Sequence, residues 1–360
     1  MISWRIIKSL LYLTLVITLT SCLYTRETRV WTADGARYRR PSLSPDGKWL
    51  LFESKQHLHI CRPDGSNRRC LSEDLENGSD ARWSPDSRSI VFSGQEKGQR
   101  DVKHRDLFKT DPEGREVINL TNTPGTDEDF VEWSPDGSRI VFVRNVAAAK
   151  RSELVISAPD GSGQRFLVIG FIARWSPDGR WIAYDSRQRD LRVIRIDGSQ
   201  DRKIVEGTPI TWTPDSKAIF YAPRRSRADE PYHIYLVRFE GGEGSLVLEN
   251  AWLDGNYDAR RMWAPSGNCL ALAVVPIVGR QDRNGIVLLS PQGKVLADYR
   301  ESEPFDYDPG VSWSPDGNTL VFSKFLAYPK VRWQGGIYTM GAEGTNLRQV
   351  LEDTVQWRLQ

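Results

Sequence analysis

The sequence predicts an all-β protein: a single β-propeller of seven four-stranded blades. A phrase of the form Trp-Ser-Pro-Asp-Gly occurs seven times in the 360 residues, at 43–47, 83–87, 133–137, 175–179, 212–216, 263–267 and 313–317. An apolar run follows each copy, and a second turn, usually of the Asp-Gly kind, comes later in most repeats. A self-similar period of this length indicates a repeat architecture. Six or eight blades remain alternatives.

The repeated phrase reads as turn chemistry between two strands. Proline presets φ for the first central turn position, Asp bonds back to the nearby backbone, and Gly accepts a positive φ. The runs that follow are short, β-branched and aromatic, as in Ile140-Val-Phe-Val143, which favours strands over helices. Each phrase therefore predicts a strand end, a tight turn and the next strand.

Closure into a ring explains why such repeats fold together. A lone four-stranded sheet leaves both faces apolar, and blades stacked around an axis bury them against one another. Residues 29–35 look like a further late strand, and 355–357 like a further first strand. We expect one of these two segments to add a strand that closes the ring.

The repeated Trp and Asp are interpreted as structural residues. A large apolar ring suits a wedge between blades, and the Asp suits a turn cap. Leu43 replaces Trp in the first copy, and Ser266 replaces Asp in the sixth. A repeat that serves the fold tolerates such changes, whereas a ring of catalytic groups would not.

The phrases, together with the later turns, resemble the TolB-like (WD40-like) propeller repeat over residues 41–351. This resemblance implies a propeller of the bacterial cell envelope that binds a protein partner. The segment between Cys22 and the first repeat is too short for the α/β domain that precedes the propeller in TolB.

The N-terminus predicts export and lipid anchoring. Arg5 and Lys8 precede an apolar run at 10–18, the pattern of a signal peptide, which we assign to residues 1–21. Leu19-Thr-Ser-Cys22 resembles a bacterial lipobox, which implies lipid attachment at Cys22; an ordinary secretory signal is the alternative. Leu23 implies the outer membrane, facing the periplasm. Residues 22–40 then form a short tether, and 41–360 the propeller.

The charge balance argues against nucleic acid as a partner. The chain has 49 Lys and Arg against 47 Asp and Glu, so removal of Arg5 and Lys8 with residues 1–21 leaves 47 of each. Nucleic-acid binding normally leaves a basic footprint. We expect a monomeric propeller with a protein partner in the envelope.

Three further cysteines follow Cys22. Cys61 and Cys70 flank the turn at 63–65, and a hairpin centred after Gly65 would place them face to face. Facing residues on antiparallel strands lie within disulfide range, and export permits oxidation. We therefore expect a Cys61–Cys70 disulfide, and a buried Cys269.

Acidic residues gather ahead of several first strands. In a propeller these segments lie near one mouth of the central channel, so the carboxylates would suit a hard cation such as Ca²⁺ or the basic tail of a partner. Ordinary turn-forming Asp is the alternative reading. The candidates are Asp80, Asp127, Asp129, Asp258, Asp306 and Asp308.

The function that these observations favour is a non-enzymatic binding or scaffold module. The four histidines, His57, His59, His104 and His233, follow no metal-ligand spacing beyond one alternating pair, and no Gly-x-Ser-x-Gly elbow occurs. No cofactor is expected apart from the calcium considered above. The alternative is a polysaccharide lyase or hydrolase with its site in the channel. Two or more histidines converging on the channel would favour that enzyme.

Overall fold

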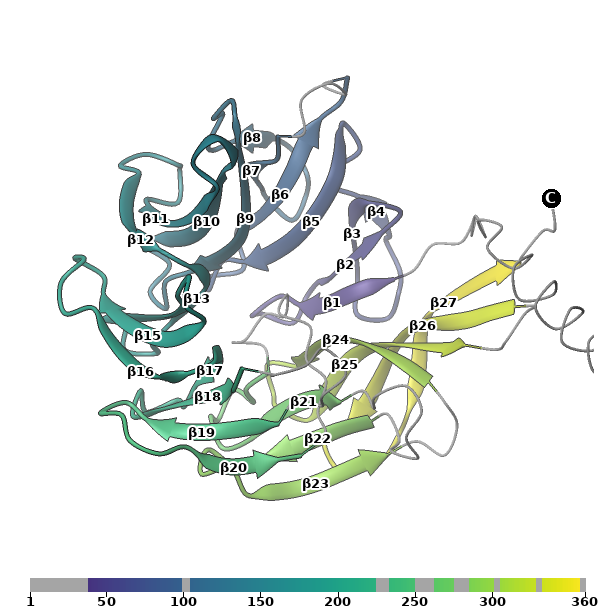
Figure 1. Ribbon diagram of the computed structural model, residues 1–360. Helices are drawn as coiled ribbons and strands as arrows, with labels where there is room; N and C mark the ends of the chain where they lie inside the picture. Colours follow the sequence, from purple (N-terminus) through teal and green to yellow (C-terminus); the bar gives the residue numbers. More distant parts are fainter. Residues whose placement is uncertain are drawn as a thin grey trace, which may run out of the picture.

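The computed structural model describes residues 38–98, 104–224, 233–249, 262–274, 285–300, 305–327 and 332–356, which form a ring of seven sheets (Figure 1). Blades 1 to 3 hold β1 (Arg39–Leu43), β2 (Leu50–Ser54), β3 (His57–Cys61), β4 (Arg69–Cys70); β5 (Leu75–Trp83), β6 (Ile90–Glu96), β7 (Asp106–Thr110), β8 (Val117–Asn119); and β9 (Thr126–Trp133), β10 (Ile140–Val146), β11 (Arg151–Ser157), β12 (Arg165–Ile169). Blades 4 and 5 hold β13 (Phe171–Trp175), β14 (Trp181–Asp185), β15 (Asp190–Arg195), β16 (Arg202–Glu206); and β17 (Thr208–Trp212), β18 (Ala218–Ala222), β19 (Ile234–Arg238), β20 (Ser245–Leu248). Blades 6 and 7 hold β21 (Leu270–Val274), β22 (Gly285–Leu289), β23 (Val295–Arg300); and β24 (Phe305–Trp313), β25 (Thr319–Ala327), β26 (Arg332–Gly341), β27 (Arg348–Gln356), and one 3₁₀ turn, η1 (Ala147–Ala149), follows β10.

Within each blade the strands pair antiparallel in chain order, from the innermost to the outermost. Six sheets have four strands. Blade 6 has three strands among its described residues, and an isolated bridge between Trp263 and Leu270 stands where its innermost strand would be. The seven-bladed, all-β fold expected from the repeats is thus confirmed.

The core is divided into seven apolar clusters, one at each contact between neighbouring blades. Because side chains alternate across a strand, one strand serves two clusters. On β6, Ile90 and Phe92 pack toward blade 1, while Val91 packs toward blade 3. Cys269 is buried in the cluster between blades 6 and 7, as expected.

The repeated Trp is a wedge between blades, as the sequence predicts, and in the six repeats that have it the indole also makes a hydrogen bond to the preceding blade. Trp133 packs in the cluster between blades 2 and 3, and its Nε1 donates to the carbonyl oxygen of Arg82 at 3.2 Å. The donors to a carbonyl oxygen of the preceding blade in other repeats are Trp83, Trp175, Trp212 and Trp313. Trp263 Nε1 donates instead to the side-chain hydroxyl of Thr211, at 3.1 Å.

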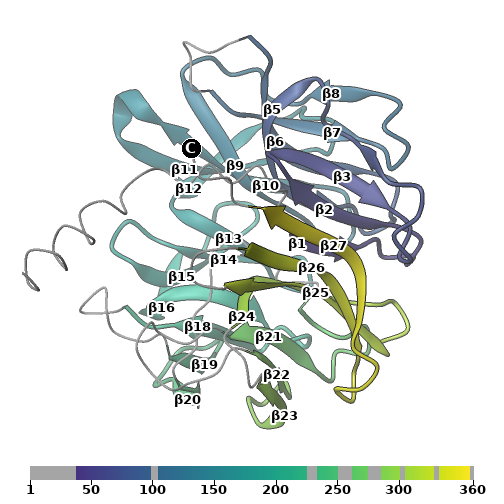
Figure 2. The same cartoon turned by 90° about the vertical axis from the view of Figure 1, so that its right-hand side faces the viewer.

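The ring closes by direct contact between blade 1 and blade 7, where β1 lies beside β24 and β25 (Figures 1 and 2). Leu43 stands in place of Trp here, and its backbone N–H donates to Ser312 Oγ at 3.2 Å. Every described sheet consists of consecutive strands, and residues 355–356 end β27, which is the outermost strand. This corrects the expected role of 355–357 as an added first strand. Residues 29–35 lie outside the described residues.

The motif turn is held by its own side chains. In the third copy, Ser134 Oγ donates to Asp136 Oδ1 at 2.6 Å, and Asp136 Oδ1 accepts the N–H of Ser138 at 3.0 Å. Gly137 has a φ of +71°, which glycine adopts without steric cost. These hydrogen bonds hold the pKa of Asp136 down, at about 2. The structural reading of the motif Asp is confirmed.

The hairpin between β3 and β4 corrects the expected Cys61–Cys70 pairing. Cys70 lies opposite His59 and Arg69 lies opposite Ile60, so the hairpin is centred between residues 64 and 65, one residue earlier than expected. Cys61 is then a diagonal neighbour of Cys70, and such neighbours are roughly 7–8 Å apart, beyond the usual disulfide span. Both are free cysteines, and burial raises the pKa of the Cys61 thiol to about 12.

Candidate binding site

A pocket of about 500 Å³ lies at the end of the channel where the inner strands finish and the motif turns begin. All seven blades contribute to its lining. The wall is made of motif residues: the prolines Pro45, Pro85, Pro135, Pro177, Pro214, Pro265 and Pro315, and the tryptophans Trp83, Trp133, Trp175, Trp212, Trp263 and Trp313. Because the motif turns fix this wall, the pocket is preformed by the fold itself.

The pocket also holds charged side chains from three consecutive blades. Arg82, Glu132 and Arg174 line it from β5, β9 and β13, and they are 6%, 5% and 5% exposed. Arg174 Nε donates to the carbonyl oxygen of Ile210 at 2.9 Å, and Glu132 Oε2 accepts the N–H of Trp175 at 3.1 Å. Hydrogen bonds to a neighbouring blade therefore hold Arg174 and Glu132 in place.

Sequence reasoning missed this charged group, although the sequence carries a signal for it. Each of the three residues stands one position before the motif Trp. Side chains alternate along a strand, so the residue before a Trp that points between blades has to point elsewhere, and here it points to the channel. Aligning the repeats on the Trp would have brought the positions together.

The expected acidic mouth lies at the opposite end of the channel, near the starts of the inner strands. Asp80 is 2% exposed, and its carboxylate contacts Arg40 Nη1 at 3.2 Å. The same Arg40 guanidinium contacts Glu53 at 3.1 Å, and Glu53 accepts the N–H of Asp80 at 3.0 Å. Arg40 and Asp80 both have a positive φ at irregularities in strand pairing, where β-bulges re-aim side chains.

Asp129 is another buried carboxyl group of this mouth with a raised pKa. It is 5% exposed, and desolvation raises its pKa to about 7, against the opposing effect of Arg105, whose Nη2 lies 2.8 Å away. The charges of Asp80 and Asp127 add to the rise in pKa. Asp129 Oδ1 is buried with no hydrogen-bond partner among the described residues. The structure thus brings Asp80, Asp127 and Asp129 together.

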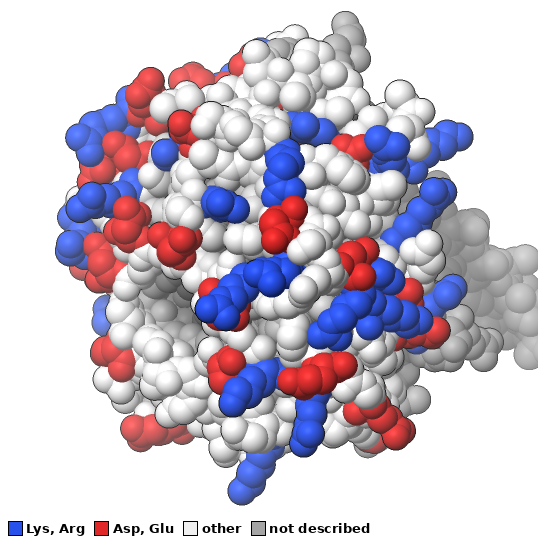
Figure 3. Space-filling view, turned by 90° about the vertical axis from the view of Figure 1, so that its left-hand side faces the viewer, with Lys and Arg blue, Asp and Glu red and all other residues white. Residues whose placement is uncertain are grey.

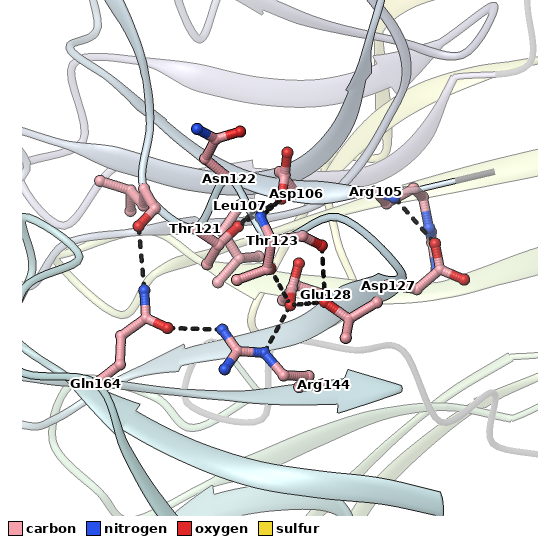
Figure 4. Close-up of polar contacts among 12 residues, drawn as sticks. Arg105, Asp106, Leu107, Thr121, Asn122, Thr123, Asp127, Glu128, Arg144 and Gln164 are labelled. Atoms are coloured by element: carbon pink, nitrogen blue, oxygen red, sulfur yellow. Dashed lines mark hydrogen bonds and ion pairs between the residues drawn. The ribbon is translucent and has the colours of Figure 1, made fainter. Parts of the chain in front are cut away.

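Asp127 belongs to a polar network that joins blades 2 and 3 (Figure 4). Its Oδ1 accepts the N–H of Arg105 at 2.9 Å. The neighbouring Glu128 is fully buried, and its Oε1 accepts from Arg144 Nε at 2.7 Å and from Thr123 Oγ1 at 2.6 Å. The acidic run 127–129 therefore has arginine and hydroxyl partners within the protein.

The other candidate carboxylates are not described as part of this group. Asp258 lies outside the described residues. Asp306 and Asp308 are placed on β24, opposite Phe325 and Ser323. Among the described residues, no three His, Cys, Asp or Glu side chains are arranged to hold a metal ion.

The histidines lie on or beside third strands of their blades, away from the innermost strands. His57 and His59 are on β3, His104 precedes β7, and His233 precedes β19. Burial lowers the pKa of His59 to about 4, with a smaller contribution from the Arg68 charge. The convergence on the channel that would favour an enzyme is not found.

These features define the class of protein: a seven-bladed β-propeller with a preformed, largely apolar pocket at one channel mouth. On the face shown in Figure 3, acidic and basic side chains are interspersed. Within the described ranges, no helix is long and apolar enough to cross a membrane.

Comparisons with known proteins agree with this class. No family model matches the chain. Solved structures with the same fold include an oligogalacturonate lyase in complex with manganese, at 13% identity and a TM-score of 0.61, covering 91% of each chain. The propeller domain of the trilobed protease from Pyrococcus furiosus, described as having an open velcro topology, has 13% identity and a TM-score of 0.59, with 89% of this chain and 96% of that one covered. A putative TolB from Agrobacterium tumefaciens has 20% identity and a TM-score of 0.48, with 59% and 81% covered.

Among curated proteins, dipeptidyl-peptidase 5 of Porphyromonas endodontalis is 24% identical over 115 residues. The match spans 29% of this chain and 16% of the peptidase, so it covers a small part of that relative. At these sequence identities the comparisons establish the propeller fold alone, so the function has to be argued from the candidate site.

Proposed function

We propose that this protein is a lipid-anchored propeller of the cell envelope that binds a partner protein in its central pocket and performs no chemistry on it. The observation that supports this function most directly is the pocket of about 500 Å³ lined by all seven motif turns. Ligand sites are typically concave and mostly apolar, hold a few placed polar groups, and have a volume of this order. A ring of turns gives a wall that a partner segment can enter without rearrangement.

The pocket is also lined by the same motif position in every repeat. Each blade adds one proline to it, at the motif position whose φ the ring already fixes. A long positive side chain at two of these positions would fill the mouth while leaving the blade cores intact.

Crosslinking in envelopes tests the proposal. We expect the double variant Pro85→Lys/Pro177→Lys to lose a crosslinked partner about tenfold relative to the wild type, since lysines block the mouth. The matched control is Pro112→Lys/Pro159→Lys, which changes the same residue type in second turns of blades 2 and 3, outside the pocket lining. Equal recovery of every partner by the blocked and control variants would contradict the proposal.

Lipid anchoring has its own test. Cys22→Ser should move the protein from the membrane to the soluble fraction, because acyl chains on this residue would supply the binding energy. Cell fractionation with mass spectrometry of the mature N-terminus measures the change, and Cys269→Ser serves as the control. A Cys22→Ser protein that still sediments with membranes would refute the anchor.

A polysaccharide lyase or hydrolase is the second candidate. The fold that the chain shares with an oligogalacturonate lyase is the observation in its favour.

A further inference from the structure

The outer hairpin of blade 1, formed by β3 and β4, concentrates positive charge. Residues 55–72 contain four basic side chains and one acid, which are Lys55, Arg62, Arg68, Arg69 and Asp64. Because β4 is the outermost strand of its sheet, the three arginines lie at the rim of the ring, away from the channel (Figure 1). We call Arg62, Arg68 and Arg69 the rim arginines.

The rim arginines have no carboxylate partner. Each donates to a neutral oxygen: Arg62 Nη1 to the carbonyl of Lys48 at 3.3 Å, Arg68 Nη1 to the hydroxyl of Tyr38 at 2.6 Å, and Arg69 Nη2 to the carbonyl of Pro112 at 2.5 Å. Within the described part of the chain, none of the three forms an ion pair. Their charges are therefore left for an anion outside the protein.

Aromatic rings hold these guanidinium groups in place. The ring of Trp49 lies between two of them, with Arg62 Cζ 3.9 Å and Arg69 Cζ 4.7 Å from its centroid. Arg68 Cζ lies 4.8 Å from the ring centroid of Tyr38. Cation–π contacts of this kind position a guanidinium without neutralising it. Arg68 is exposed and the other two are half-buried, so the charges are displayed at the surface from ordered side chains.

The single acid of the hairpin has its own partners. Asp64 accepts the N–H of Ser66 at 2.9 Å. Hydrogen bonds from Ser66 lower the pKa of Asp64, and the charge of Arg348, on β27 of blade 7, contributes to this effect. The exposed Arg348 thus adds a further positive charge beside the turn.

The proposed lipid anchor leads to the same edge of the propeller. Tyr38, which Arg68 contacts, is the first described residue and stands 16 positions after Cys22. A chain of that length spans at most about 55 Å. Acyl chains on Cys22 would therefore keep the rim arginines within reach of the membrane surface.

We propose that the rim arginines bind the anionic headgroups of the membrane in which the protein is anchored. This inference rests on the lipid anchor of the proposed function. Each arginine near an anionic membrane surface strengthens binding by about fivefold, so the contact is too weak to replace acyl chains and instead orients the anchored propeller. Contact along the outer edge of blade 1 places the membrane beside the ring, and both mouths of the channel stay open to a partner.

Co-sedimentation of the unacylated mature Cys22→Ser protein with lipid vesicles at low salt tests the proposal. We expect vesicles of equal parts phosphatidylcholine and phosphatidylglycerol to bind it at least about tenfold more tightly than phosphatidylcholine alone. Adding Arg62→Gln/Arg68→Gln should weaken this binding about 25-fold, fivefold for each charge. The matched control is Arg180→Gln/Arg187→Gln, which removes the same charge from exposed positions on blade 4 and should have little effect.

Arg62→Lys/Arg68→Lys separates charge from folding. It gives up the same stacking and hydrogen bonds but keeps both charges, so vesicle binding should largely be retained. About 1 M salt, where the Debye length is about 3 Å, should release the protein. Equal binding to neutral and anionic vesicles would overturn the inference, as would equal losses from the rim and blade 4 variants.

The same salt step distinguishes this inference from the anchor. Acyl chains hold a protein on membranes at high salt, because their binding is hydrophobic. If the acylated wild type sediments with membranes in about 1 M salt while the Cys22→Ser protein shows no preference for anionic vesicles, the anchor stands and only the rim contact fails. Loss of a crosslinked protein by Arg62→Gln/Arg68→Gln, with vesicle binding unchanged, would assign the rim arginines to an acidic protein and also overturn the inference.

Discussion

Trp175→Ala should destabilise the propeller by about 3–5 kcal/mol, the range for removing a large aromatic side chain from a core. Trp175 is 4% exposed in the cluster between blades 3 and 4, and its Nε1 donates to the carbonyl oxygen of Glu132 at 3.3 Å. Trp175→Phe keeps most of the packing and loses that hydrogen bond, so it should cost about 1 kcal/mol. Equilibrium denaturation with urea measures both values.

Trp181→Ala is the matched control. This indole is half-buried at the contact between blades 4 and 5, where it packs against Phe239 with ring centroids 5.0 Å apart. It is not a motif residue, and its loss should cost clearly less than the loss of Trp175. Equal losses from the two substitutions would show that the motif Trp has no special role between the blades.

The second large effect is on the pH dependence of stability. The pKa of Asp129 is raised to about 7 in the folded protein, above the ordinary value of 3.8. Between these values the folded state holds a proton that the unfolded state has released, so stability falls as the pH rises from about 4 to about 7. With a limit of about 1.4 kcal/mol per pH unit and per proton, Asp129 should account for about 2–4 kcal/mol across this interval.

Asp129→Asn should therefore flatten the curve of unfolding free energy against pH between pH 4 and pH 7. Asp185, whose pKa burial raises to about 6, retains its own smaller slope in the variant. The matched control is Asp160→Asn in an exposed turn, where the hydrogen bonds of Ser162 lower the pKa of the carboxyl. A variant curve that runs parallel to the wild-type curve would refute the assignment.

The fold could be predicted because each repeat carries its own local instructions. The Pro, Asp and Gly of the motif make a turn from bonds within six residues, as in 134–139. The Trp then reaches only the neighbouring blade. Seven repeats therefore specify a ring through contacts within each repeat and between neighbouring blades, and the number of repeats sets the number of blades.

The features that sequence reasoning missed depend on register and on packing between blades. A shift in the hairpin register separates Cys61 from Cys70. No residue between them predicts this shift from the sequence. The partners of Asp80 and Asp129 are arginines from other strands, Arg40 and Arg105. The charged group of the pocket is recognised only when the repeats are aligned on the motif Trp, which brings positions 82, 132 and 174 together.

The indole hydrogen bonds between blades all run in one direction along the chain, from each motif Trp to the blade before it. Besides the indole bonds, the second-turn glycines follow this rule: a Cβ on Gly161 of blade 3 would lie 2.3 Å from the carbonyl oxygen of Leu120, which follows β8 of blade 2. Every described blade is made of consecutive strands, so the preceding blade is already synthesised when the next one emerges from the ribosome. The new blade can therefore pack against a folded neighbour. Synthesis can therefore assemble the ring one blade at a time, and the contact between Leu43 and Ser312 is the last to form. Under mechanical tension on the two chain ends, the same contact should be the first to part.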